Sequence, residues 1–510
     1  MSRPLVIVAV IVFALAGLAP IALMGARVDG DDLVAIFGVR TLELLGRTAL
    51  IGGGSAAIAL VLGVPFGFLV ARTDMIGARV MRPLGIVPLL LPPLILAASW
   101  TALTGVRGGF ATAMVLGLGT FPLVSMYVAR AFERIDARRE EAALLAGGLR
   151  AVLRMELPLV LPSALCAACF AFGFAVNDFS VPDYVSSIGP KYNVYADDVF
   201  ATWRSAQDPG RAVAAALPLV LLSLAALIPA LELRRRSRLD ALDGDFRRPA
   251  LLALGAWRWP ALAFALAVLG TAVIAPIARL IWESGGGPRG FTFAAMGAAF
   301  ARAFELARAN LRTSLLVSTG AALVCVPLAL VLGHALERSR ARALQLAVLL
   351  PLAVPAILLG IGNIAMWNRP ATGALYDSPW MVVVLLVGRF APLAVLALSA
   401  AVAMLDRNQE DAARLAGASP GRRLTSIVAP PLRGALAGGA ALVFVLSMRE
   451  IDAAIFVPAA NGTVMFRLYN AVHFGRDDFV AALALLVVFF VALPGLAWTL
   501  FRRERLEVLP

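Results

Sequence analysis

Long apolar runs separated by short, arginine-bearing stretches make up most of this sequence. Runs of roughly 18 to 25 residues are long enough to cross a hydrocarbon slab about 30 Å thick as helices. Their apolarity is continuous and does not alternate, which favours helices over the strands of a barrel. We predict about twelve membrane-spanning helices, near residues 5–24, 48–71, 83–104, 110–129, 163–180, 213–232, 260–282, 313–334, 344–366, 379–404, 434–457 and 479–501.

The composition supports an all-α integral membrane protein embedded in a lipid bilayer. Hydrophobic residues make up 61% of the 510 residues and charged residues only 15%. The net charge of +13 is spread over loops between the apolar runs, so no nucleic-acid partner is expected. Cys166, Cys169 and Cys325 lie inside apolar runs and predict helix packing without disulfides. His334 and His473 are isolated, and no metal site is expected.

The distribution of arginines predicts the orientation of the chain. An even number of spans places both termini on one side of the membrane. Putting them in the cytoplasm assigns most loop arginines to that side, as the positive-inside rule requires. The first run is expected to be a retained span, because about twenty apolar residues is long for a cleaved signal sequence.

The two halves of the chain resemble each other. "VPLLLPPLILAASW" (87–100) parallels "LLPLAVPAILLGIG" (349–362), with Pro88 and Pro92 matching Pro351 and Pro355. We predict a first repeat over 1–233, a basic cytoplasmic linker over 234–249 and a second repeat over 250–510. Six spans in each repeat make the copies parallel, related by a pseudo-two-fold axis along the membrane normal.

A polar, alanine-rich segment follows the fourth span of each half, over 133–162 and 405–433. Acidic residues favour a helix start, glycine favours a helix end, and the prolines are expected to end the helix that follows. We therefore predict a helix-turn-helix whose small residues form a docking surface. The alternative, an amphipathic connector on the membrane, does not explain two copies at equivalent positions. The residues of this pattern are Glu140, Glu141, Ala142, Ala143, Gly147, Pro158 and Pro162 in the first copy, and Asp411, Ala412, Ala413, Gly417, Pro430 and Pro431 in the second.

This pattern resembles the EAA loop of permease subunits of binding-protein-dependent ABC importers, and the resemblance extends over both halves. It looks most like the fused permeases grouped with ferric-iron, thiamine and phosphonate importers. The resemblance implies two tandem type I permease repeats in a bacterial inner (plasma) membrane. The implied partners are two copies of an ABC ATPase subunit and a periplasmic substrate-binding protein.

The resemblance further implies that each loop docks on one ATPase subunit. The residues that it assigns to this coupling are Glu141, Ala142, Ala143, Gly147, Asp411, Ala412, Ala413 and Gly417. Two departures are visible. Asp411 replaces the family's glutamate, and the first copy is two residues shorter between its glycine and proline, so that the first loop is a candidate for a different docking mode.

The chain has no phosphate-binding loop of its own. A Walker A loop needs the lysine of G-x-x-x-x-G-K-[ST]. Lys191 is the only lysine, and it stands between Pro190 and Tyr192. We therefore expect a transport subunit that is not an enzyme and binds no cofactor, with ATP and Mg²⁺ held by the partner ATPase.

Polar residues near the end of the fifth span of each half predict a translocation path. They are Asn177 and Asp178 in the first half, and Arg449, Glu450 and Asp452 in the second. Charges within a membrane are costly and mark function by default. The alternative is a helix-surface ion pair between Arg449 and Asp452 with ordinary loop acids. Arg389, inside the tenth span, is expected to pair with an acid from another helix.

The substrate is less defined by the sequence. Six acidic residues near the outer path weakly favour a cation such as ferric iron, with thiamine, a phosphonate or a polyamine as alternatives: Asp178, Asp183, Asp197, Asp198, Glu450 and Asp452. A rival function is a secondary transporter with six plus six spans. The loop "VARTDMIGARVMR" lacks the first glycine and first arginine of the G-x-x-x-D-R-x-G-R-R pattern of that class's best-known fold.

Overall fold

The computed structural model describes residues 3–501 apart from 35, 37, 207, 237–246, 248, 287–289, 340, 457, 459, 460, 475 and 476. Most of the predicted basic linker 234–249 and the arginines at 502, 503 and 505 thus lie outside the described residues. Within the described part, nearly all regular structure is helical, and the one β-bridge joins Thr73 to Leu252. The predicted all-α fold is confirmed.

The chain divides into two compact units that do not follow the order of the sequence. The first-half unit contains 39–197 and 221–280, and the second-half unit contains 1–38, 198–220 and 281–510. Each unit therefore holds the main body of one half together with the first predicted span of the other half. The predicted domain boundaries, which follow the repeats, stay a prediction.

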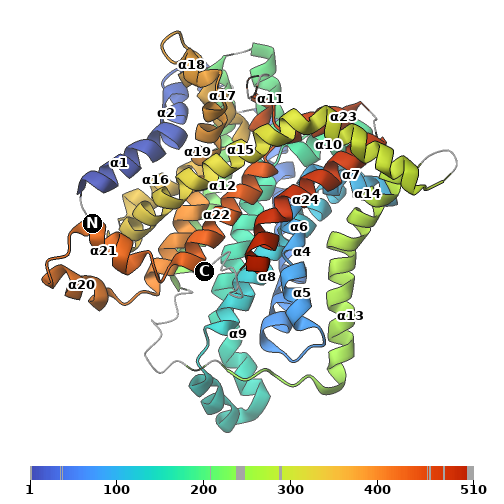
Figure 1. The fold of residues 1–510 in the computed structure, drawn as a ribbon. Coiled ribbons are helices and arrows are strands. Elements are labelled where there is room, and N and C mark those ends of the chain that lie inside the picture. Colours follow the sequence, from blue (N-terminus) through green and yellow to red (C-terminus); the bar gives the residue numbers. More distant parts are fainter. Residues whose placement is uncertain are drawn as a thin grey trace. The chain divides into compact units, whose positions relative to one another are not determined.

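Three long helices form the body of the first-half unit: α4 (Val39–Arg72), α8 (Gly108–Glu133) and α9 (Ala137–Asn177), which pack on one another (Figure 1). Gly67 of α4 permits close packing, because a Cβ there would lie 2.5 Å from the Ser125 carbonyl oxygen of α8. The unit also contains α5 (Ala78–Leu84), α6 (Val87–Leu90), α7 (Pro93–Thr104), α10 (Ser180–Ile188) and α13 (Arg258–Leu269). Helix α13 continues through η3 (Gly270–Ile274) into α14 (Ala275–Gly285), of which residues 275–280 belong to this unit.

The second-half unit is built around α15 (Phe293–Ser339), α19 (Pro379–Ala403), α22 (Arg433–Met448) and α24 (Asp477–Phe501). The N-terminal helices α1 (Arg3–Phe13), η1 (Ala14–Leu18) and α2 (Ala19–Gly25) pack against this body. Gly388 marks the crossing, since a Cβ on it would lie 2.2 Å from the Ala16 carbonyl oxygen. A side chain at 388 would therefore push the N-terminal span away from α19.

Shorter helices complete the fold. They are α3 (Gly30–Val34), α16 (Arg342–Ala353), α17 (Ala356–Trp367), α18 (Gly373–Tyr376), α20 (Arg407–Leu415), α21 (Pro420–Arg423), η4 (Leu424–Val428), η5 (Ala454–Phe456) and α23 (Val464–His473) in the second-half unit, η2 (Gly255–Trp257) in the first-half unit, and α11 (Tyr195–Ala206) and α12 (Pro209–Arg236), which contribute to both.

Among the described residues, nine helices are long and apolar enough to cross a membrane, or up to twelve if each of three bent pairs is one span. The runs predicted as continuous spans over 83–104 and 344–366 are both broken. The first bends by 97° between α6 and α7, and the second by 98° between α16 and α17. Pro92 and Pro355 stand at the breaks in extended conformation, because proline cannot continue the preceding helix. Equivalent prolines in the two halves thus stand at equivalent bends.

The eleventh predicted span, 434–457, was too long. Its helix α22 ends at Met448, with Arg449 as the capping residue. The second half therefore places Arg449, Glu450 and Asp452 after the helix and not inside it. Asn177 and Asp178 lie at the matching point of the first half, where α9 ends.

Candidate coupling segments and translocation residues

Both polar segments begin in the same way. Asp136 caps α9 by accepting a hydrogen bond from the backbone N–H of Arg138 at 2.8 Å. Asp406 caps α20 by accepting one from the N–H of Asn408 at 2.9 Å. Each carboxylate satisfies a helix donor that has no partner within the helix. The predicted acidic helix start is therefore present, and the capping side chain is an aspartate four residues before Glu140 and Glu410.

Both segments then turn at a glycine. In the second copy it is the expected Gly417, but in the first copy it is not the expected Gly147. Gly417 has φ +81°, in the left-handed region that favours glycine. In the first copy the positive φ, +66°, belongs to Gly148, while Gly147 is extended with φ −174°. Gly148 is therefore the residue whose backbone needs glycine, which the match between Gly147 and Gly417 did not indicate.

The two copies differ after the turn. In the second, α21 and η4 are followed by a turn at Pro430 and Pro431, and a 90° bend leads into α22. In the first, Pro158 and Pro162 lie inside α9, which runs on to Asn177. The prediction that prolines end the second helix is thus wrong for the first copy. Its shorter spacing lets the coupling segment continue directly into the span.

The outer faces of the two segments match residue by residue. Glu141 and Ala142 are exposed and Ala143 is partly buried, and Asp411, Ala412 and Ala413 repeat this order. Sequence reasoning missed a leucine two residues before the matching glycines. Leu145 is 91% exposed and Leu415 is 85% exposed. Both segments therefore present an apolar side chain to their surroundings at equivalent positions.

The inner face of the first segment carries a buried ion cluster, which we call the first clasp. Arg72, the last residue of α4, is 2% exposed. Its Nη2 lies 2.5 Å from Oε2 of Glu140 and 3.1 Å from Oε1 of Glu156. Both carboxylates are buried as well. A buried charge is tolerated when it is paired and hydrogen-bonded, and here one guanidinium serves two carboxylates from α9.

The end of the predicted linker and the residues after it lie along the same cluster, and we call the described residues 247 and 249–254 the strap. Its Ala250 carbonyl accepts a hydrogen bond from the Arg72 guanidinium. The Leu252 N–H donates to the Arg72 carbonyl at 2.9 Å, and the Leu252 carbonyl accepts from the Asp74 N–H at 3.1 Å. Arg247 pairs with the exposed Glu141 at 3.1 Å, and its carbonyl accepts from the Ala137 N–H at 2.9 Å. The strap thus holds both the end of α4 and the start of α9.

Asp74 takes part in the same contacts. Its carboxylate accepts a hydrogen bond from the Leu254 N–H at 2.9 Å and pairs with Arg258. The hydrogen bond from Arg258, followed by that from Leu254, lowers the pKa of the Asp74 carboxyl.

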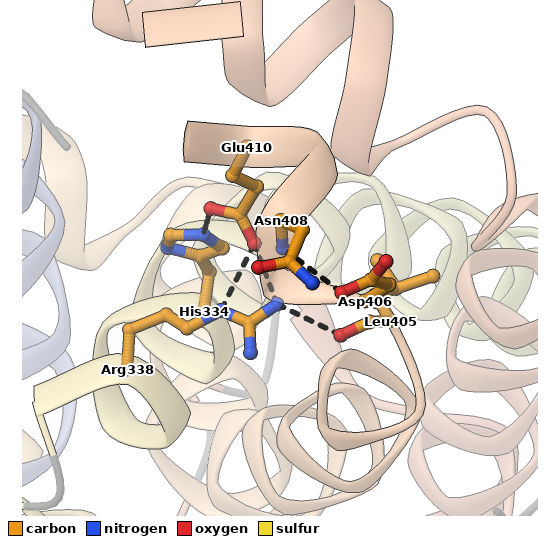
Figure 2. A network of polar contacts seen from close by, with 6 residues as sticks. All are labelled: His334, Arg338, Leu405, Asp406, Asn408 and Glu410. Atoms are coloured by element: carbon orange, nitrogen blue, oxygen red, sulfur yellow. Dashed lines mark hydrogen bonds and ion pairs between the residues drawn. The ribbon is translucent and has the colours of Figure 1, made fainter. Parts of the chain in front are cut away.

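The inner face of the second segment carries a second clasp (Figure 2). Glu410 Oε2 lies 2.7 Å from Nε2 of His334, and its Oε1 accepts from Nη2 of Arg338 at 2.6 Å. Arg338 also donates to the Leu405 carbonyl at 3.2 Å. Burial raises the pKa of the Glu410 carboxyl, but the hydrogen bonds from His334 and Arg338 outweigh burial and leave this pKa below its ordinary value.

The predicted path residues of the first half are tied to backbone and side chains of their own unit. The buried Asn177 donates to the Gly173 carbonyl at 2.8 Å and to the Ser223 hydroxyl at 2.9 Å. Asp178 accepts from the Val181 N–H at 2.9 Å. The Asp178 carboxylate thus caps the turn into α10.

In the second half, the Glu450 carboxylate likewise accepts a hydrogen bond from a backbone N–H three residues further on. Its Oε1 accepts from the Ala453 N–H at 3.0 Å. Its Oε2 lies 3.9 Å from Nε of the buried Arg389, the ion partner that was predicted for this arginine. Arg389 also donates to the Val354 carbonyl at 3.3 Å, which α16 leaves free at its break with α17. Asp452 is buried and Arg449 caps α22. The transport roles of all these residues stay predictions.

Comparison with known proteins shows which family and which individual proteins the chain is similar to. Two segments, residues 63–238 and 325–503, match the family described as binding-protein-dependent transport system inner membrane component. Over 144 residues the chain is 28% identical to the molybdate/tungstate transport system permease protein of Pyrococcus abyssi, covering 27% of this chain and 57% of that protein. Over 233 residues it is 27% identical to the molybdenum transport system permease protein of Mycobacterium tuberculosis, covering 41% of this chain and 85% of that protein.

A third relative is the probable molybdenum ABC transporter permease protein of Haloferax volcanii, 31% identical over 139 residues, covering 24% of this chain and 52% of that protein. The chain thus spans little more than half the length of the Pyrococcus and Haloferax relatives. None of these three carries a ferric-iron, thiamine or phosphonate name, so the narrower resemblance to those importers gains no support.

Proposed function

Because the chain belongs to the family of inner membrane components of binding-protein-dependent transport systems, matched once in each half, we propose that it is the complete permease pore of an ABC importer. The single observation that carries this proposal is the pair of matching coupling segments, each presenting the same sequence of exposed residues. A lone permease domain needs a second copy to line a pore, whereas this chain holds both.

We propose that one ATPase subunit docks on each segment and that a periplasmic binding protein delivers the solute. ATP and Mg²⁺ then bind to the ATPase subunits, and both termini of this chain lie in the cytoplasm. Leu145 and Leu415 support this proposal, because a leucine exposed by about nine tenths gains most when a partner covers it. Their equivalent positions favour two copies of one partner.

For the substrate we propose a tetrahedral oxyanion of the molybdate or tungstate type. The relatives named above support this class, and so do the contacts of the acidic residues. Asp178 and Glu450 accept hydrogen bonds from backbone amides, and Glu450 faces Arg389. Carboxylates engaged in this way have fewer lone pairs left for a cation, which weakens the argument from Asp178 and Glu450 for ferric iron. The binding protein is expected to make most of the selection.

The test begins with the chain purified in mild detergent from membranes of its source organism. We expect an ATPase subunit to co-purify in twofold excess over the permease. Reconstituted into liposomes with the binding protein, the complex should accumulate labelled molybdate only when ATP is supplied on the ATPase side. Ferric iron and thiamine serve as competing substrates and should not reduce molybdate uptake.

The rival function, secondary transport by six plus six spans, predicts a different result. The purified chain alone would then accumulate solute along an imposed proton or sodium gradient, without any ATPase. Gradient-driven uptake by the chain alone would overturn the proposed function.

A further inference from the structure

The two clasps join equivalent parts of the two halves. Arg72 and His334 each stand seven residues after a proline within their helix, Pro65 in α4 and Pro327 in α15. Their partners Glu140 and Glu410 stand directly before Glu141-Ala142-Ala143 and Asp411-Ala412-Ala413. Each half therefore ties the end of its second-span helix to the first turn of its coupling segment through basic side chains on the helix and one glutamate on the segment.

The clasps are built with different chemistry around this shared link. The first has one arginine and two carboxylates, with Ala250 of the strap supplying a carbonyl. The second has a histidine, an arginine and one carboxylate, with a carbonyl from Leu405 of its own half. The side chains differ but the connection is the same, which indicates that the connection is what both halves require.

Neither glutamate belongs to the surface offered to a partner. Glu140 is 6% exposed, and the Glu410 side chain is 13% exposed, whereas the following acids Glu141 and Asp411 are exposed. The first turn of each segment thus has an outer acid that faces outwards and an inner acid held by the clasp. A force applied to the outer side of this turn reaches α4 or α15 through the inner acid.

We propose that Arg72 and His334 are positioning residues that transmit movement of each coupling segment to the translocation helices. α4 packs on α8 and α9, and α15 packs on α19, α22 and α24, so each long helix contacts the body of its unit. Breaking a clasp leaves the outer docking surface in place but removes the direct side-chain link between the first turn of the segment and the long helix. This inference rests on the proposed function, because it requires an ATPase that moves the segments.

The experiment compares variants of the second clasp in the reconstituted complex. The double variant His334→Leu/Arg338→Leu removes both α15 side chains that hold Glu410. This double variant and Glu410→Gln should retain the co-purified ATPase yet lower the molybdate taken up per ATP hydrolysed, by about fivefold or more. His334→Arg supplies the base that the first clasp uses and should keep the wild-type ratio. The matched control is Arg302→Leu, also in α15, whose ion pair with Asp478 is exposed; it should leave the ratio unchanged.

The possible outcomes separate this inference from the proposed function. A wild-type ratio in both His334→Leu/Arg338→Leu and Glu410→Gln would overturn the clasp proposal and leave the importer intact. If neither variant reaches the membrane, His334→Arg decides, since a folded but uncoupled complex also contradicts the proposal. Failure of the proposed function has a different signature, because wild-type protein would then show neither a co-purified ATPase nor ATP-driven uptake.

Discussion

At the scale of single residues, the coupling segments have two distinctive features, which are buried charges on the inner face and exposed leucines on the outer face. Arg72 pairs with two buried carboxylates, those of Glu140 and Glu156, and its removal takes this cation from both. Leu145 and Leu415 are the reverse case, since they are apolar and exposed. The first group stabilises the chain, and the second is available to a partner.

Replacing Arg72 by leucine should lower the free energy of unfolding by about 3–5 kcal/mol, the usual cost of breaking a buried ion pair. Thermal unfolding of the detergent-solubilised protein measures the change. The triple variant with Glu140→Gln and Glu156→Gln should recover much of the loss. Arg247→Ala breaks only an exposed pair and should cost about 0–1 kcal/mol. Equal losses for Arg72→Leu and Arg247→Ala would contradict the burial argument.

Replacing Leu145 and Leu415 by serine should weaken ATPase docking without destabilising the permease. Each leucine is exposed, so its loss removes no packing within the chain, while burial of a leucine by a partner contributes about 1.5–3 kcal/mol. The measurement is the amount of ATPase retained during purification, with unfolding temperature as the control. Full retention in the double variant would show that these leucines are not covered.

Glu410 allows a pH test of the second clasp. Its pKa is lowered in the folded protein, so the stabilisation is fully present above the ordinary value of 4.5 and is lost as the pH falls through the lowered pKa. The stability difference between wild type and Glu410→Gln should therefore shrink as the pH falls below 4.5. A difference that grows as the pH falls below 4.5 would contradict the assigned direction.

At the scale of elements, proline and glycine decide where helices bend, turn and cross. The bends of 97° and 98° lie at Pro92 and Pro355, two prolines that the comparison of the two halves had already paired. The sequence thus indicated the repeat, and the structure added the bends. The missing bend at Pro158 and Pro162 was not predictable from residue type, because proline kinks or ends a helix depending on its surroundings. The spacing between glycine and proline was the visible signal, and its consequence needed the structure.

Alanine substitutions can separate the glycines of the coupling turns. Gly148→Ala and Gly417→Ala place a side chain on a backbone with positive φ, which costs about 1–2 kcal/mol. Gly147→Ala meets an extended backbone and should cost less. Limited proteolysis of the two segments, compared with wild type, measures the disturbance. Greater cleavage in Gly147→Ala than in Gly148→Ala would contradict the assignment of the turn.

The crossing of α19 by the N-terminal span has its own test. Gly388→Ala puts a methyl group 2.2 Å from the Ala16 carbonyl oxygen, and overpacking of this kind typically costs about 1–3 kcal/mol. Gly119→Ala in α8 is the control, because its Cβ would meet nothing within 4 Å. Unfolding temperature in detergent should fall for the first variant alone.

At the scale of the whole molecule, the sequence was most informative about class and least informative about assembly. Continuous apolarity predicted the all-α membrane fold, and the repeated acidic-alanine-glycine segments predicted the permease family. The exchange of first spans between the units left no local signal, since a span's sequence does not say which helices it packs against. The clasps were also missed, because Arg72 and Glu156 lie far apart in the sequence and meet only after folding.

Acidic residues counted along the sequence are weak evidence for the solute. Asp178 and Glu450 looked like ligands for a cation when only their charge was known. Their hydrogen bonds to backbone amides and the proximity of Arg389 to Glu450 became visible only in three dimensions. Charge counted along a chain does not distinguish a carboxylate that caps a helix from one that awaits a ligand.

ATP-driven uptake by the reconstituted complex tests the central claim most directly. Liposomes containing this chain, its co-purified ATPase and the binding protein should accumulate labelled molybdate when ATP is present. They should accumulate none when ATP is replaced by a non-hydrolysable analogue or when the ATPase is omitted. Molybdate uptake that is unchanged without the ATPase would contradict the account of this chain as the pore of an ABC importer.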